Sequence, residues 1–204
     1  MCCFDLPKPR QILYLISGPA GSGKTTLCQR LLYDSETAVS RVVTATTRTP
    51  RVGEIPSVDY YFLNKECFEA KIKDKEFLEF ATVHGNYYGT LRSEVKEKFG
   101  TGEDMLLNVD FQGVQTLVKT ALTDPLLYQR VVTVFIAPQS LQVIRERMKE
   151  RGQDSPKTIE RRLKTAEREM KHLGFFDYCL VTGDRESDFK RFKAIYLAEK
   201  MKPI

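Results

Sequence analysis

Short apolar runs alternate with longer amphipathic segments along most of the chain. The apolar runs are rich in branched aliphatic residues, as in strands, whereas the segments between them repeat apolar residues at helical spacing. The strand-like runs span residues 11–17, 104–110, 131–137 and 178–182, and the helical segments span 24–33, 111–122, 140–151 and 185–199. This alternation predicts an α/β fold, in which a parallel sheet is covered by helices on both faces.

Two stretches interrupt the alternation. Residues 42–90 hold short extended pieces around a helical segment near residues 64–73, which predicts an inserted lobe of mixed structure. Near Gly152 one helix ends, and Ser155 with Pro156 supplies the cap and first residue of the next, which predicts a small helical lid. We expect one domain, with residues 1–10 as an extension, 11–41, 91–138 and 163–204 as the core, 42–90 as the lobe and 139–162 as the lid region.

Composition narrows the class of protein and of ligand. The chain has 204 residues, 42% of them hydrophobic, and a formal net charge of +5, which suits one core domain and a small anionic ligand. No stretch approaches the ~18 apolar residues of a membrane span, and residues 1–10 lack the apolar stretch of a secretory signal. The five cysteines show neither zinc nor C-x-x-C spacing. We expect a cytoplasmic protein without nucleic-acid or membrane partners, as monomer or homo-oligomer.

The clearest chemical signal lies between the first strand-like run and the first helical segment. Residues 18–25, Gly-Pro-Ala-Gly-Ser-Gly-Lys-Thr, fit the phosphate-binding loop pattern G-x-x-x-x-G-K-[ST] in full. Glycines let the backbone N–H groups turn toward one anion, which then rests on a helix N-terminus. Lys24 would reach the β- and γ-phosphates and Thr25 a magnesium ion, so a nucleoside triphosphate is the leading ligand. The alternative is a glycine-rich turn without a ligand.

The inserted lobe carries a second signal, T-A-T-T-R-T-P-R-V-G-E at residues 44–54, followed by Asp-Tyr-Tyr at 59–61. Arg48 and Arg51 lie close enough in sequence to converge on one anion. Arginine offers planar paired donors to phosphate, and the hydroxyl of Tyr60 adds another donor. A solvated basic hairpin is the alternative for this stretch.

A third segment, residues 76–90, places a carboxylate and several hydroxyls around the Gly85 turn. A carboxylate can accept hydrogen bonds from both N1–H and N2–H₂ of guanine, two donors that adenine lacks. Glu79 is our candidate for this role. The alternative is a surface residue on an alternating strand.

Two further groups of residues extend these signals. Asn108 and Asp110 share a face at the end of an apolar strand, because side chains alternate along a strand. Arg147 and Arg151 share a helix face, and Arg162 follows on the next helix, so that three arginines can close on a triphosphate. Ion pairs such as Glu160 with Lys164 are possible on the same helices, where they would be ordinary solvated pairs.

Taken together, these segments resemble guanylate kinases, members of the nucleoside monophosphate kinase group with a P-loop fold. The resemblance runs from about residue 11 to the C-terminal helix. It is most specific in T-T-R-T-P-R-x-G-E with D-Y-Y-F downstream, and in F-L-E-x-A with G-N-Y-Y-G-T. It implies transfer of a phosphoryl group from ATP to GMP, giving ADP and GDP, with magnesium; acceptance of dGMP stays open.

The resemblance also implies a role for individual residues. Catalysis would depend on Lys24, Arg48, Arg147, Arg151 and Arg162. The guanine base would be bound by Thr44, Glu79, Thr90 and Asp110, and its 5′-phosphate by Arg48, Arg51, Tyr60 and Tyr88. ATP would be bound by Gly18, Pro19, Ala20, Gly21, Ser22, Gly23, Lys24, Thr25 and Thr26. Magnesium would be bound by Thr25 and, through water, Asp110.

Three positions depart from the family pattern. Ser57 replaces a usual glycine in a turn, Asn108 replaces a usual carboxylate near the magnesium ion, and Gly183 replaces a usual asparagine near the adenine pocket. None removes a group that the chemistry requires. Two alternatives stay open: a guanylate-kinase-like binding module that captures phosphorylated peptide, although such modules lack a working phosphate loop, and a related kinase of phosphorylated sugars.

Overall fold

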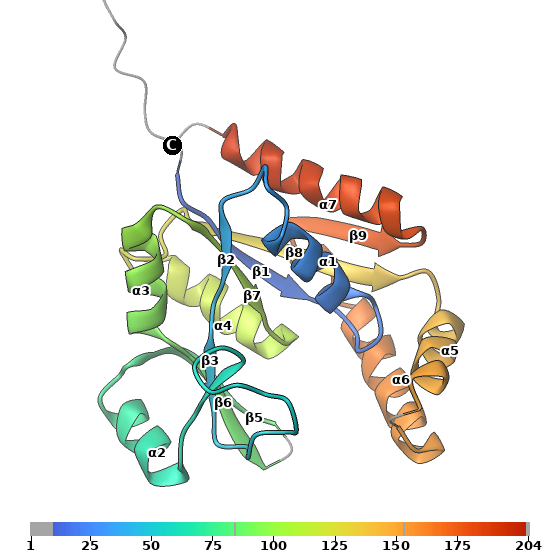
Figure 1. The fold of residues 1–204 in the computed structure, drawn as a ribbon, viewed down its shortest axis with the longest axis horizontal. Helices are drawn as coiled ribbons and strands as arrows, with labels where there is room; N and C mark the ends of the chain where they lie inside the picture. Colours follow the sequence, from blue (N-terminus) through green and yellow to red (C-terminus); the bar gives the residue numbers. More distant parts are fainter. Residues whose placement is uncertain (1–9, 84, 153, 203–204) are drawn as a thin grey trace, which may run out of the picture.

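The computed structural model describes residues 10–83, 85–152 and 154–202, and within them a parallel five-stranded sheet forms the centre of the molecule (Figure 1). Its strands lie in the order β2-β7-β1-β8-β9, and every neighbouring pair is parallel. They are β1 Leu13–Ser17, β2 Val39–Arg41, β7 Asp104–Asn108, β8 Val131–Pro138 and β9 Tyr178–Thr182. Because parallel strands end at the same edge, this order places the loops after β1, β7, β8 and β9 side by side.

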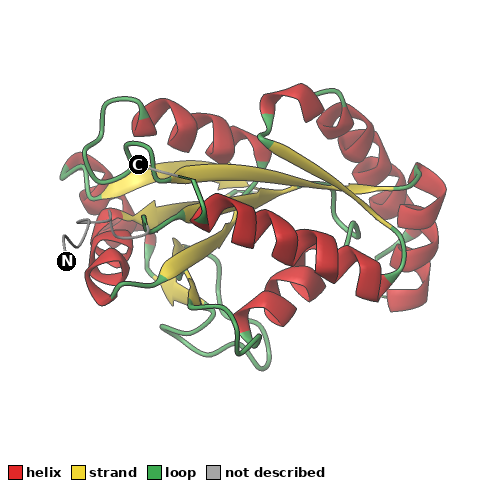
Figure 2. Cartoon of the chain, turned by 90° about the horizontal axis from the view of Figure 1, so that it is seen from above, coloured by secondary structure: helices red, strands yellow, loops and turns green. Residues whose placement is uncertain are grey.

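Helices cover both faces of this sheet (Figure 2). Helices α1 (Lys24–Leu32) and α7 (Arg185–Lys200) pack on the face to which Tyr14 and Ile16 point. Helices α3 (Arg92–Thr101) and α4 (Phe111–Ala121) pack on the opposite face, against Leu13 and Leu15. Strand β1 is therefore buried on both sides, which explains why Leu13 to Ile16 are a continuous apolar run rather than an alternating one. The predicted fold class is confirmed.

The inserted lobe is a second, smaller sheet with one helix. Its strands are β3 Thr44–Thr46, β4 Tyr60–Phe62, β5 Phe77–Val83 and β6 Asn86–Leu91, in the order β4-β3-β6-β5. Helix α2 (Lys65–Lys73) begins at Asn64, whose side chain accepts a hydrogen bond from the N–H of Cys67 at 2.7 Å. Phe68 of this helix is fully buried and stacks on Phe77 and Tyr87 of the sheet.

The lid region consists of two antiparallel helices with a small core of their own. Helices α5 (Leu141–Arg151) and α6 (Pro156–Met170) pack through Ile144, Met148, Ile159 and Leu163. The Ser155 side chain caps α6 and Pro156 opens it, as the sequence predicts. Helix α6 continues without a break past residue 162, the expected end of the lid region. A short 3₁₀ helix, η1 (Leu173–Phe175), joins α6 to β9.

Three details differ from the expectations. Strand β2 and helix α3 were not expected, since β2 has only three residues and α3 has a weak apolar periodicity. Strand β7 ends at Asn108 instead of residue 110, because Asp110 caps helix α4. Strand alternation therefore does not explain the direction of the Asp110 side chain. Among the described residues, no helix combines the length and the apolar character needed to cross a membrane.

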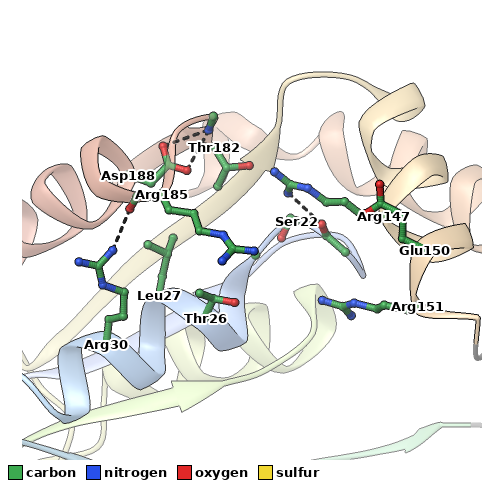
Figure 3. Close-up of a pocket in the computed structure, with 13 residues that line it drawn as sticks. Ser22, Thr26, Leu27, Arg30, Arg147, Glu150, Arg151, Thr182, Arg185 and Asp188 are labelled. Carbon is green, nitrogen blue, oxygen red and sulfur yellow. Dashed lines mark hydrogen bonds between the residues drawn. The ribbon is translucent and has the colours of Figure 1, made fainter.

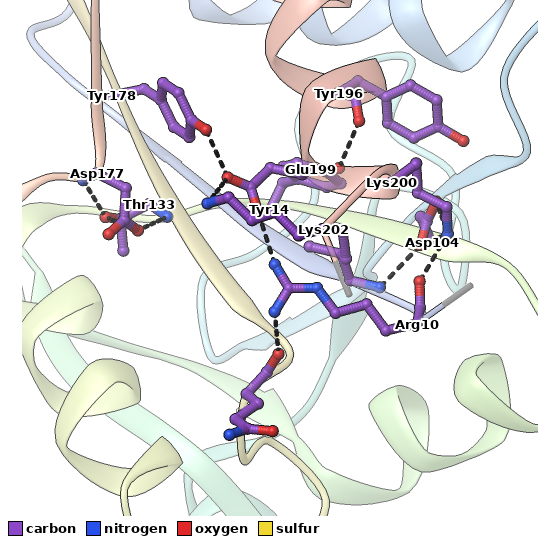
Figure 4. Close-up of polar contacts among 12 residues, drawn as sticks. Arg10, Tyr14, Asp104, Thr133, Asp177, Tyr178, Tyr196, Glu199, Lys200 and Lys202 are labelled. Atoms are coloured by element: carbon purple, nitrogen blue, oxygen red, sulfur yellow. Dashed lines mark hydrogen bonds and ion pairs between the residues drawn. The ribbon is translucent and has the colours of Figure 1, made fainter. Parts of the chain in front are cut away.

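The C-terminal helix is tied to the sheet by a buried ionic cluster, which Figure 4 shows. The Glu199 carboxylate has no solvent exposure and accepts hydrogen bonds from Arg10 and Lys202, both at 2.6 Å, and from the Tyr178 hydroxyl at 2.5 Å. The neighbouring Lys200 bonds to Asp104 at 2.9 Å. Disrupting a buried carboxylate with this many partners lowers the free energy of unfolding strongly, since removing one member of the cluster leaves other charges buried and unpaired.

We predict that Glu199→Ala lowers the free energy of unfolding by about 3–5 kcal/mol, because it leaves Arg10 without its buried partner. Urea denaturation followed by circular dichroism measures the change. The matched control is Glu186→Ala: Glu186 pairs with Arg30, but its side chain is 70% exposed, so little change is expected. Equal, small effects of both substitutions would contradict a structural role for the cluster.

Candidate active site

The phosphate-binding loop leaves β1 through a turn that needs glycine. Gly18 has a φ of +134°, and a Cβ there would lie 2.3 Å from the carbonyl oxygen of Ile136 on β8. Any other residue would therefore combine backbone strain with a collision against main chain. Gly23 caps α1 in the left-handed conformation, with a φ of +102°. The loop thus curls in the way that anion binding requires, with the N-terminus of α1 at its end.

Lys24 lies folded into this loop. Its ammonium group donates hydrogen bonds to the carbonyl oxygens of Gly18 and, at 2.8 Å, Pro19. Burial lowers the pKa of Lys24 to about 8; the Arg151 charge acts in the same direction, and Glu169 acts against it. The lysine is thus a poorly solvated cation whose present partners are neutral carbonyls, and an anionic ligand can replace them favourably.

A cavity of about 400 Å³ opens beside the loop (Figure 3), and we call it the donor cavity. It is lined from the loop by Gly21, Ser22 and Gly23, from α1 by Thr26, and from the end of β9 by Thr182 and Gly183. Ser22 is fully buried, and its hydroxyl has no hydrogen-bond partner among the described residues. A buried polar atom without a partner at such a loop fits a bound phosphate oxygen.

Two of the three predicted lid arginines reach the donor cavity. Arg147 and Arg151 line it from α5, and Arg147 donates to the Gly21 carbonyl at 3.1 Å (Figure 3). Arg162 is not among the lining residues; its guanidinium pairs with Asp154 in the α5–α6 turn at 2.9 Å. The remaining loop residues differ in exposure: Thr25 and Ala20 are exposed, whereas Pro19 is buried.

A second cavity, of about 230 Å³, lies between the lobe and the end of β7, and we call it the acceptor cavity. The structure brings most residues of the predicted guanine and phosphate sites together here, although they come from five different segments. The lining residues with polar side chains are Thr44, Tyr60, Glu79, Tyr88, Asn108 and Asp110. Residues distant in sequence thus face one space of the size of a base and part of its sugar.

Glu79 is turned into this cavity by an irregularity in β5. The register between β5 and β6 shifts between Phe77 and Glu79, so that the adjacent residues Leu78 and Glu79 are both buried. A bulge of this kind redirects one side chain at a site. Burial raises the pKa of Glu79 to about 7; the hydrogen bond from Thr90 lowers it, and the Asp110 charge raises it. The carboxylate is therefore held in a setting that favours a ligand with N–H donors.

Thr90 supports Glu79 instead of lining the cavity. It is fully buried, lies opposite Glu79 on β6, and donates its hydroxyl hydrogen to the Glu79 carboxylate at 2.7 Å. Asp110 accepts a hydrogen bond from the N–H of Gly113 at 2.8 Å, as the cap of α4. A Cβ on Gly113 would lie 3.3 Å from the Glu79 carboxylate and 2.2 Å from Val109, so the close approach of α4 also confines Glu79.

Arg48 is held by a partner that the sequence analysis did not assign a role. Its guanidinium donates to Glu54 at 2.8 Å and to the Thr49 carbonyl at 2.7 Å. Its Nε is buried without a partner among the described residues. Glu54 also accepts the backbone N–H of Arg51 at 2.7 Å, and the Arg51 side chain is exposed. The sequence could have pointed to Glu54 through its place at the end of the T-R-T-P-R-x-G-E motif.

Sequence reasoning also missed Asp154, the partner of Arg162, and Glu169. Glu169 lies near both Lys24 and Asp110, since their charges act on its carboxyl group; its pKa is raised by burial, with Lys24 opposing this and Asp110 adding to it. Neither residue belongs to a motif that a single sequence reveals, because each acts through a group on another segment.

Comparisons with known proteins identify the family of the chain. The sequence model of the family described as guanylate kinase matches residues 10–199. The guanylate kinase of Clostridium perfringens (strain SM101) is 40% identical over 191 residues, 94% of this chain and 85% of that relative. That of Bartonella quintana is 40% identical over 190 residues, 93% and 82% of the two chains.

The structural comparison gives the same result. The crystal structure of guanylate kinase from Anaplasma phagocytophilum has a TM-score of 0.72 and 30% sequence identity, and the match covers 96% of this chain and 89% of that one. The similarity thus extends over the core, the lobe and the lid region together. The chain belongs to the guanylate kinase family and is an ATP:GMP phosphotransferase.

Proposed function

We propose that GMP binds in the acceptor cavity, that ATP binds in the donor cavity, and that the γ-phosphoryl group passes between them beside Lys24. The observation that carries the proposal is the buried Glu79 carboxylate, which faces a cavity also lined by Tyr60, Tyr88 and Asp110. The complete loop with Lys24 in place favours this enzyme over a phosphopeptide-binding module, and Glu79 favours a guanine over a phosphorylated sugar.

Guanine recognition follows from the donors and acceptors in the acceptor cavity. The Glu79 carboxylate accepts from N1–H and N2–H₂ of the base, while Thr44 and Asp110 lie within the same cavity for the remaining edge. Thr90 acts through Glu79, because its hydroxyl fixes one carboxylate oxygen. Adenine offers neither donor at these positions, so AMP leaves a buried carboxylate unpaired, which is costly.

The 5′-phosphate of GMP is bound by Arg48, Arg51, Tyr60 and Tyr88. To bind the phosphate, the Arg48 guanidinium gives up part of its contact with Glu54. Its buried Nε has no partner among the described residues and can donate to the phosphate directly. The phosphate needs no general base, since its second pKa of about 6 leaves it ionised at neutral pH. Catalysis is then the alignment of two anionic groups and the neutralisation of their repulsion.

On the donor side, residues 18–24 and Thr26 hold the phosphates of ATP, and Lys24 exchanges its carbonyl partners for the β- and γ-phosphates. Arg147 and Arg151 already line this cavity. Arg162 joins them when it leaves Asp154, which requires a movement of the lid. We therefore propose that the lobe (residues 42–90) and the lid region (139–162) close over the substrates and exclude water.

The residues near the loop fit a magnesium ion that travels with ATP. Among the described residues, no group of three or more histidine, cysteine, aspartate or glutamate side chains forms a metal site, so the protein supplies few ligands itself. Magnesium commonly keeps several waters and binds substrate phosphates, and the exposed Thr25 hydroxyl and the Asp110 carboxylate fit such a site. When bound, the ion neutralises charge on the transferred phosphoryl group. A cytoplasmic location stays a prediction, and the acceptance of dGMP stays open.

We predict that Glu79→Gln raises the KM for GMP about 10- to 100-fold, because it replaces hydrogen bonds to a charged acceptor by one weaker bond. The KM for ATP should change less than twofold. Steady-state ADP production with GMP, AMP, CMP or UMP measures both constants and the acceptor range. The matched control is Glu76→Gln, at a half-exposed carboxylate on the segment before β5. An unchanged KM for GMP in Glu79→Gln would refute the assignment.

We also predict that GMP binds about 20-fold more weakly at pH 6 than at pH 8, about tenfold from Glu79 and about twofold from the GMP phosphate. The pKa of Glu79 is raised to about 7, and GMP needs the ionised carboxylate, so affinity is lost as the pH falls through 7. Isothermal titration calorimetry gives the Kd at each pH. In Glu79→Gln, only the GMP phosphate still titrates in this pH range. The Kd of this variant should therefore change by only about twofold between pH 6 and pH 8. An equal change in Kd in both proteins would contradict the role of Glu79.

A further inference from the structure

A buried carboxylate outside both cavities joins the lobe to the core. Glu94 lies in the first turn of α3 and is 7% exposed. Its Oε1 accepts a hydrogen bond from the N–H of Val43 at 3.1 Å, and its Oε2 accepts one from the Tyr61 hydroxyl at 2.7 Å. Lys98, one turn further along α3, lies 3.6 Å from Oε1 and balances the charge. Glu94 is not among the described residues that line either cavity, so a ligand does not explain its burial.

This carboxylate lies where the chain passes between the core and the lobe. Val42 still belongs to the core, because its N–H donates to a carbonyl of β7 at 2.9 Å and its side chain packs among the core residues. Val43 is the next residue, directly before β3. The chain leaves the lobe at Leu91, the last residue of β6, and enters α3 at once (Figure 1). Glu94 therefore contacts the entry segment from the helix that forms the exit.

Each of the two donors is the neighbour of a residue that lines the acceptor cavity. Thr44 follows Val43 at the start of β3. Tyr60 precedes Tyr61 at the start of β4. Thr44 and Tyr60 both line the acceptor cavity, and they lie opposite each other in the parallel pair β3–β4. Because successive side chains of a strand point to opposite faces, Tyr60 faces the cavity while Tyr61 faces Glu94.

The strands that carry these two cavity residues are short and lie at one side of the lobe sheet. Strand β4 is at the edge, next to β3, and each of them has three residues. The pairing of β3 with β6 begins at Ala45, so Thr44 lies just outside it. A hydrogen bond to an ionised acceptor is stronger than one between neutral groups. Burial raises the pKa of Tyr61 to about 12, and the bond to Glu94 adds to this, so the hydroxyl stays a donor at neutral pH.

We propose that Glu94 is a positioning residue for GMP binding. Through its two donors it fixes the starts of β3 and β4, and thereby the side chains of Thr44 and Tyr60. The inference rests on the proposed binding of GMP in the acceptor cavity. It adds that the core helix α3 sets the geometry of a site formed largely by the lobe, through a residue that does not touch the nucleotide.

The first test is Glu94→Ala, which removes both hydrogen bonds. It should raise the KM for GMP about 5- to 10-fold, whereas kcat and the KM for ATP should each change less than twofold. Steady-state ADP production with either substrate varied measures all three constants. A merely structural role would give another result, since a smaller folded fraction lowers the apparent kcat and leaves both KM values unchanged. The matched control is Glu97→Ala, at an exposed glutamate on the same helix, which should leave every constant unchanged.

Two conservative variants test whether the effect passes through the hydrogen bonds. Tyr61→Phe removes one bond and keeps the ring, so the KM for GMP should rise about threefold. Added to Glu94→Ala, it should cause no further rise beyond twofold, because its acceptor is already gone. Glu94→Gln keeps one acceptor oxygen and should restore the KM for GMP to within about threefold of the original. These two single variants also decide the question if Glu94→Ala does not fold.

The proposal would be overturned by an unchanged KM for GMP in Glu94→Ala, or by equal rises in the KM for GMP and for ATP. Effects of Glu94→Ala and Tyr61→Phe that multiply in the double variant would also overturn it, since the two residues would then act independently. If Glu94→Ala does not fold, an unchanged KM for GMP in both Tyr61→Phe and Glu94→Gln has the same consequence.

Glu79→Gln, measured in the same assay, separates this inference from the proposed function beneath it. If Glu79→Gln leaves the KM for GMP unchanged, the placement of GMP in the acceptor cavity is wrong. If Glu79→Gln raises the KM for GMP and Glu94→Ala does not, GMP lies in the cavity and only the role of Glu94 is wrong.

Discussion

The structure depends on the burial of one strand. Strand β1 packs apolar side chains against helices on both of its faces, so neither its register nor its direction can change without exposing one of the two cores. The strand ends at Ser17, and the backbone of the next residue, Gly18, lies so close to Ile136 that no side chain fits between them. The packing of the sheet therefore fixes where the phosphate-binding loop begins, and through it the position of Lys24.

Four cations of the proposed substrate sites have partners that a substrate would replace. Lys24 is bonded to loop carbonyls, Arg147 to the Gly21 carbonyl, Arg48 to Glu54 and Arg162 to Asp154. In the proposed function, the contacts of Lys24, Arg147 and Arg48 hold these three side chains near the phosphates that they bind and so reduce the entropy that binding must overcome. Because phosphate is a stronger partner than a carbonyl, the exchange at Lys24 and Arg147 favours the bound state.

Glu79 shows the opposite arrangement, a charge buried before its ligand arrives. A bulge in β5, the Thr90 hydroxyl and the close approach of α4 at Gly113 keep the carboxylate in a poorly solvated cavity. The raised pKa of Glu79 is the consequence of this burial. In the proposed function, the free energy that burial costs is recovered when N–H donors of the base pair with the carboxylate, which would link selectivity for guanine to the stability of the lobe.

Local patterns in the sequence were enough for the class of fold and for naming candidate site residues, several of which line the donor and acceptor cavities. The alternation of apolar runs and helical segments predicted the parallel sheet, and the spacing around Gly18, Lys24, Arg48 and Glu79 indicated the chemistry, because turn glycines and phosphate-binding cations occur in short contiguous motifs. Helix α3 and strand β2 escaped prediction, since their order comes from packing on the sheet and hardly from their own periodicity.

Tertiary structure decided everything that depends on contacts between distant segments. The inward turn of Glu79 requires the register shift against β6, and Thr90 became a support because it lies opposite Glu79. Glu169, whose carboxyl group lies near both Lys24 and Asp110, also comes from a segment that only folding brings to the site. A sequence determines which groups are present; their partners depend on side-chain positions that local patterns do not encode.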